Sequence, residues 1–132
     1  MAKTVEKVTD LPSARRVEKR ILDEAARHGY DDSSMFGIRL ALEEGLNNAI
    51  KHGNRYDPTK AITVCYEVDA GRVAVTIADE GVGFDPCSVP DPTADENLEK
   101  PCGRGLMLIR AYMDEVRFNE RGNQIHMVKL NT

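Results

Sequence analysis

The sequence predicts an α+β fold, a two-layer sandwich in which three helices cover one face of a mostly antiparallel, roughly five-stranded sheet. The apolar period changes along the chain, from helical spacing before residue 53 to strict alternation after Pro58. The elements follow in the order strand, two helices, hairpin, loop, helix, hairpin, and hairpins pair their strands antiparallel. At 132 residues the chain suits one hydrophobic core, so residues 1–132 are expected to form a single domain.

The first half of the chain predicts a strand and two helices. Residues 3–9 are expected to form a short edge strand. Pro12 and Ser13 then open a helix that ends at Gly29, with apolar residues at helical spacing: Ala14, Val17, Ile21, Leu22 and Ala25. A second helix is expected from about Met35 to His52, terminated by Gly53-Asn54, with its own apolar line: Met35, Ile38, Leu42, Leu46 and Ala49.

The second half predicts two hairpins separated by a loop and a helix. Residues 62–68 and 73–77 alternate apolar and polar positions around a turn at Asp69-Ala70-Gly71. Residues 84–102 hold four of the six prolines and five acidic residues, which predicts a long loop of the kind that often covers an active site. A third helix is expected over 106–113, and the last hairpin over 116–130.

The composition argues against several classes of function. Eighteen basic and 22 acidic residues give a net charge of −4, which does not favour direct binding to nucleic acid. No apolar run approaches the ~20 residues that span a bilayer, and the N-terminus lacks the apolar core of a secretory signal. The three cysteines lack the paired spacing of a zinc site. We therefore expect a cytoplasmic protein with no membrane contact.

The first motif lies on the second helix. Glu44, Asn48 and His52 are four residues apart and form one polar line along the helix. Small residues run beside this line and are expected to leave room for a ligand: Ala41, Gly45 and Ala49. The same spacing also suits solvated side chains on an exposed face, and periodicity alone equally allows the parallel line Glu43, Asn47 and Lys51.

The second motif is Asp79-Glu80-Gly81-Val82-Gly83, at the end of an expected strand. An acidic residue there can accept a hydrogen bond from a purine amino group, and the glycines let the backbone approach a ligand closely. The alternative is an ordinary turn, in which Asp and Gly are favoured for their backbone dihedrals.

The third motif is Gly103-Arg104-Gly105-Leu106, at the expected start of the third helix. Free N–H groups and the positive end of a helix dipole favour an anion such as phosphate at such a position. The alternative is a loop-to-helix joint in which the glycines provide flexibility.

Together the three motifs resemble the N, G1 and G2 boxes of the GHKL, or Bergerat-fold, ATPases. Glu44 and Asn48 match the N box, Asp79-x-Gly81-x-Gly83 the G1 box and Gly103-Arg104-Gly105-Leu106 the G2 box. The resemblance is greatest to anti-sigma factor serine/threonine kinases of the RsbW and SpoIIAB type, to which Asp114-Glu115-Val116 also looks similar. It extends over nearly the whole chain.

The resemblance implies a role for each matching residue. It makes Glu44 the general base and Asn48 a ligand of Mg²⁺ that bridges to the phosphates of ATP. It assigns Asp79 to the adenine amino group, with Gly81 and Gly83 shaping that pocket. It places the phosphates of ATP or ADP against four residues, Gly103, Arg104, Gly105 and Leu106, and it makes the loop over 84–102 the ATP lid.

The resemblance also implies the activity and the partners. The expected protein phosphorylates a serine or threonine of a small, STAS-type anti-sigma factor antagonist, sequesters a sigma factor, and forms a homodimer, as such proteins often do. Two alternatives remain open. One is a nucleotide-gated module that switches partners without kinase activity, and the other is a detached ATPase domain of a two-component system.

Overall fold

The computed structural model describes residues 3–57, 59–81, 101–120 and 122–131, with the backbone alone at 52 and 101–106. It contains three α-helices in the described part of the chain, α1 (Leu11–Arg27), α2 (Asp32–Asn48) and α4 (Pro101–Tyr112), and a π-helical turn, η1 (Ala49–Gly53). The strands are β1 (Thr4–Val8), β2 (Ile62–Val68), β3 (Arg72–Ala78), β4 (Glu115–Phe118) and β5 (Gln124–Leu130).

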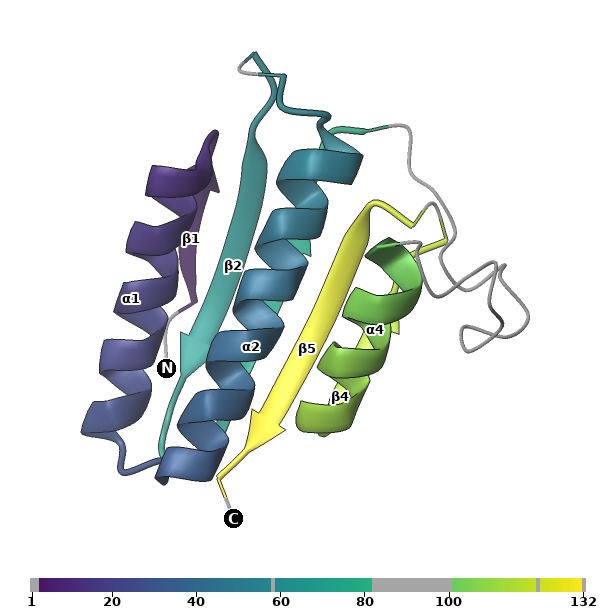
Figure 1. The fold of residues 1–132 in the computed structure, drawn as a ribbon. Helices are drawn as coiled ribbons and strands as arrows, with labels where there is room; N and C mark the ends of the chain where they lie inside the picture. Colours follow the sequence, from purple (N-terminus) through teal and green to yellow (C-terminus); the bar gives the residue numbers. More distant parts are fainter. Residues whose placement is uncertain (1–2, 58, 82–100, 121, 132) are drawn as a thin grey trace.

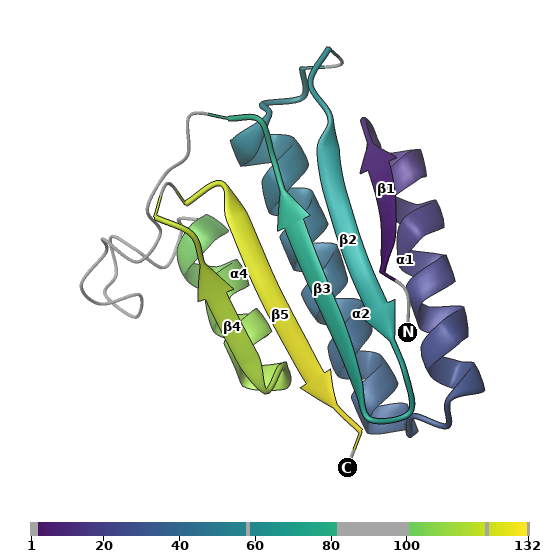
Figure 2. The ribbon, with the colours of Figure 1, turned by 180° about the vertical axis from the view of Figure 1, so that it is seen from behind.

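The five strands form one sheet in the order β1-β2-β3-β5-β4, and every neighbouring pair is antiparallel. Figure 1 shows the three helices side by side on one face of this sheet, and Figure 2 shows that none of the described helices covers the opposite face. The predicted α+β sandwich with helices on one face is therefore confirmed.

Helix α1 begins and ends where its sequence signals predict. Asp10 caps the helix, because its Oδ1 accepts a hydrogen bond of 2.9 Å from the backbone N–H of Ser13. Pro12 occupies the first turn, where a missing N–H costs nothing. After the helix, Gly29 adopts a φ of +81°, which a residue with a Cβ rarely adopts.

The core lies between the sheet and the helices. Strand β2 buries alternate residues, Ile62, Val64, Tyr66 and Val68, as its period predicts. Helix α2 packs closely on the sheet, since a Cβ on Gly45 would lie 2.9 Å from Cδ1 of Ile77. The expectation that Gly45 leaves room for a ligand is wrong, because side chains of β3 and β5, including Met127, fill that space.

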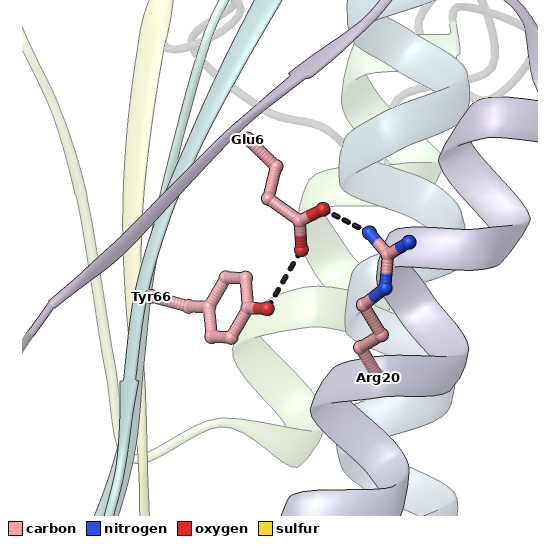
Figure 3. Close-up of polar contacts among 3 residues, drawn as sticks. All are labelled: Glu6, Arg20 and Tyr66. Carbon is pink, nitrogen blue, oxygen red and sulfur yellow. Dashed lines mark hydrogen bonds and ion pairs between the residues drawn. The ribbon is translucent and has the colours of Figure 1, made fainter.

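A polar cluster joins the edge strand to helix α1 (Figure 3). The carboxylate of Glu6 on β1 forms an ion pair with Arg20 on α1 and accepts a 2.7 Å hydrogen bond from the hydroxyl of Tyr66 on β2. Burial, reinforced by the neighbouring Glu6 carboxylate, raises the pKa of Tyr66 to about 12. The tyrosine therefore stays protonated as the donor in this cluster.

Several predicted boundaries are wrong. Helix α2 begins at Asp32, three residues before the expected Met35, and becomes a π-helix after Asn48. Helix α4 begins at Pro101 and not at Leu106, so the last two residues of the expected lid loop are helical. The rest of that loop lies outside the described residues. In the part of the chain that the structure describes, no helix is long and apolar enough to cross a membrane.

Candidate functional site

Elements that carry the three motifs meet at one end of the sandwich. The C-terminal ends of α2 and β3 come together there, because Gly53 after α2 lies against Asp79 after β3. Helix α4 runs antiparallel to α2, since Gly37 near the start of α2 packs against Tyr112 at the end of α4. The start of α4 therefore lies at the same end as the other two elements (Figure 1).

Asp79 is held in place by its neighbours. Its backbone N–H donates to the carbonyl oxygen of Asn123 at 2.9 Å, and its Oδ1 accepts from the N–H of Gly81 at 2.8 Å. Oδ2 lies against Gly53, where an added Cβ would be only 2.2 Å away. A Cβ on Gly81 would be equally close to the carbonyl oxygen of Gly53. Only glycine fits at either position in this arrangement.

The environment of Asp79 favours a ligand that donates a hydrogen bond. Partial burial raises the pKa of its carboxyl, while the N–H of Gly81 and the charge of Lys60 act in the opposite direction. A half-buried carboxylate gains from an additional donor, because hydrogen bonds to the charged form offset its lost hydration. An exocyclic amino group of a purine is such a donor.

Sequence reasoning missed two residues of this site, Gly53 and Asn54, by treating them only as a helix terminator. Asn54 is buried, and its Oδ1 accepts a 2.8 Å hydrogen bond from the backbone N–H of Glu80, which fixes the chain just after Asp79. The backbone is unusual here, since Arg55 and Tyr56 both have positive φ after the π-helix. Such local irregularity is frequent at functional sites.

The structure separates the two polar lines on α2. Glu43, Asn47 and Lys51 line a groove of about 330 Å³ between α2 and α1. Glu44 follows Gly37 by seven residues, about two helical turns, so both share the side of α2 that packs against α4. Asn48 continues this side one turn later, and both Glu44 and Asn48 are half-buried.

The third motif differs from its expected conformation. Gly103, Arg104, Gly105 and Leu106 all lie within α4, which starts two residues before Gly103. Gly103 is in the first turn, where backbone N–H groups lack helical partners, whereas Gly105 and Leu106 lie beyond it. Gly83 of the second motif lies outside the described residues.

The residues present suit a magnesium nucleotide. Asp79 with the close-packed Gly53 and Gly81 provides an acceptor beside bare backbone, which is what an adenine edge requires. Asn48 provides an amide oxygen and Glu44 a carboxylate on one side of α2. Mg²⁺ is usually held by one or two such protein oxygens together with substrate phosphates.

Comparisons with known proteins show the family of the chain. Residues 6–129 match the family model of the histidine kinase-like ATPase domain. The chain is 31% identical over 115 residues to the serine-protein kinase RsbW of Bacillus licheniformis, spanning 80% of this chain and 70% of that relative. The corresponding protein of Bacillus subtilis is 32% identical with the same coverage, and that of Staphylococcus epidermidis is 33% identical over 108 residues, 76% of this chain and 67% of the relative.

A solved structure has the same fold. The crystal structure of the RsbU and RsbW domains of a Mycobacterium tuberculosis protein superimposes with a TM-score of 0.60 at 19% sequence identity. The superposition covers 97% of this chain but only 32% of that larger chain. From the family match and the identity to its relatives, the chain belongs to the GHKL superfamily of histidine kinase-like ATPases, and within it to the RsbW type of serine-protein kinase.

Proposed function

We propose that this protein is an ATP-dependent serine/threonine kinase that phosphorylates a small, STAS-type anti-sigma factor antagonist and sequesters a sigma factor. The observation that carries the proposal is the contact of Asp79 with Gly53 and Gly81, which joins the end of β3 to the end of α2. In this proposal Asp79 is the purine acceptor, and the contact supports it because it joins Asp79 to the helix that carries Glu44 and Asn48. Membership of the RsbW type supports the same activity.

Adenine recognition rests on Asp79 in this proposal. With Oδ1 already bonded to Gly81, Oδ2 accepts from the adenine amino group. Guanine carries a carbonyl oxygen at the matching position, so two acceptors would face each other there. Gly81 and Gly83 keep the pocket free of side chains, and ATP and ADP share the same base contact.

Glu44 and Asn48 would act on the phosphates and the protein substrate. Phosphoryl transfer depends mainly on positioning and on neutralising charge, which Mg²⁺ supplies when it is bound. Asn48 is the proposed protein ligand of that ion. Glu44 orients the incoming serine or threonine hydroxyl and takes up its proton as general base.

The third motif and the loop before it are the proposed parts of the site around the phosphates of ATP. Gly103, Arg104, Gly105 and Leu106 are the proposed phosphate contacts, with the first turn of α4 directed at the anion. Residues 84–102 are the proposed ATP lid. The protein would act in the cytoplasm as a homodimer, without direct contact to nucleic acid or membrane.

The test is phosphoryl transfer from labelled ATP and Mg²⁺ to candidate antagonists, chosen from genes beside this one. We expect label on the antagonist in an acid-stable form, as for phosphoserine or phosphothreonine. An acid-labile product would instead indicate phosphohistidine and the two-component alternative. Partner affinity that changes between ATP and ADP, with no transfer to any antagonist, would indicate a switch without kinase activity.

A further inference from the structure

Two glutamates from different helices face each other in the groove between α1 and α2. Glu18 comes from α1 and Glu43 from α2, and both line this groove of about 330 Å³. Neither residue belongs to the proposed kinase site. Glu43 precedes Glu44 but points to the α1 side of the helix, away from α4.

The contact between these two carboxyl groups requires a proton. Both side chains line the same groove, and Glu43 acts on the Glu18 carboxyl through its charge and as a side-chain hydrogen-bond partner, which both raise the pKa of Glu18. Ionised carboxylates only accept hydrogen bonds, so two of them cannot bond directly unless one is protonated. Oε1 of Glu18 is fully buried and has no donor among the residues that the structure describes. A proton on the pair supplies a donor between the two carboxyl groups and removes one negative charge from the half-buried Glu18.

The positive charges around the groove do not replace the proton on the carboxyl pair. Arg15 on α1, Arg39 on α2 and Lys51 on η1 are the cations around the groove. All three are exposed, as Glu43 itself is, so water and salt screen these charges. Burial, followed by the charge of Glu43, outweighs the two arginines and raises the pKa of Glu18 to about 7.

We infer that Glu18 and Glu43 share one proton at mildly acidic to neutral pH, that this proton bridges α1 to α2, and that its loss weakens the contact between the two helices. The inference rests on the groove and the carboxyl pair alone, so it does not depend on nucleotide binding or on kinase activity. The fold would thus contain a pH-sensitive contact on the helix that also carries Glu44.

The direction of the pH effect follows from linkage. In the unfolded chain Glu18 loses its proton near the ordinary value of 4.5, whereas in the folded protein it keeps it up to about 7. Between these values the folded state binds more protons, so the pair lowers the free energy of unfolding as pH rises. Above about pH 7 the contribution of the pair to the free energy of unfolding no longer changes with pH.

The first test uses urea denaturation at about pH 5 and about pH 8 to compare the folding equilibrium constants of the full chain and its Glu18→Gln variant. Glutamine keeps a donor toward Glu43 but has no proton to lose. Between about pH 5 and about pH 8, the folding equilibrium constant of the wild type should fall by a factor at least ~10 times larger than that of the variant. Glu120→Gln, an exposed site in the β4–β5 turn, should behave like the wild type. Parallel pH profiles for wild type and Glu18→Gln would overturn the inference.

The second test follows Glu18 directly and does not depend on the stability of that variant. Carboxyl carbon chemical shifts of the wild type should show a Glu18 titration with a midpoint of about 7. Glu43→Gln should shift this midpoint down, because the amide donates to the ionised carboxylate and the neighbouring charge is gone. A wild-type midpoint near 4.5, or one that is unchanged in Glu43→Gln, would contradict the shared proton.

Discussion

At the scale of single residues, Asp79 carries the largest specific prediction. In Asp79→Asn, the amide oxygen can still accept from Gly81, but the amide nitrogen then replaces Oδ2 and faces the adenine amino group. Two opposed donors cost about 1 to 3 kcal/mol, so calorimetry should show ATP and ADP affinity falling by roughly 5- to 150-fold. Guanine nucleotides should bind poorly to the wild type. Equal ATP affinity of variant and wild type would show that Asp79 does not contact the adenine.

Gly53 provides a second test of the same contact. The Cβ of Gly53→Ala would displace the Asp79 carboxylate, since it would lie 2.2 Å from Oδ2. We expect nucleotide affinity to fall by about tenfold, as for the loss of one hydrogen bond to a charged group. Gly71→Ala is the matched control, because its Cβ would meet Oδ1 of Asp69 at an ordinary 3.4 Å. If both variants bind ATP like the wild type, the Gly53 contact does not shape the pocket.

The residues that the sequence did not indicate share one property. Asp79 could be predicted because it precedes closely spaced glycines, which is a local pattern. The contribution of Asn54 depends on the backbone of Glu80, 26 positions away, and Gly53 matters only through its contact with Asp79. Local patterns carry no information about such pairings, so a helix terminator was the natural interpretation of both residues.

At the scale of the element, the close packing of Gly45 against the sheet determines the position of α2. Gly45→Leu would place a large side chain where Ile77 and Met127 already pack. Leucine is a good helix former, so any loss of stability reflects overpacking and not helix propensity. Urea denaturation should show a loss of about 1 to 3 kcal/mol. Unchanged stability would mean that α2 is free to move away from the sheet.

The element boundaries show where periodicity stops being informative. Asp31 accounts for the early start of α2, because its side chain caps the helix by accepting a hydrogen bond from the N–H of Ser34. Asp31 lies before the apolar line, so the helical period does not indicate this start. The π-turn after Asn48 has no signature in a 3.6-residue pattern. Pro101, Gly103 and Gly105 argue against a helix by propensity, but proline is favoured in a first turn.

At the scale of the whole molecule, alternation in the hairpins and one apolar stripe on each helix were enough to predict the sandwich. Hairpins predict that neighbouring strands pair, as β2 and β3 do. The insertion of β5 between β3 and β4 follows from no local signal, yet it gives Asp79 its backbone partner, Asn123. The sequence could therefore predict the layers and the motifs, but not how distant segments complete the site.

The central claim is that the α4-facing side of α2 performs phosphoryl transfer, and two adjacent glutamates test it most directly. Glu44→Gln should retain ATP binding but lose transfer to the antagonist by roughly 10² to 10⁴-fold, the usual contribution of a positioned base. Glu43→Gln is the matched control on the α1 side and should retain transfer. Loss of transfer in Glu43→Gln with normal transfer in Glu44→Gln would contradict the account, and would assign the chemistry to the line of Glu43 and Asn47.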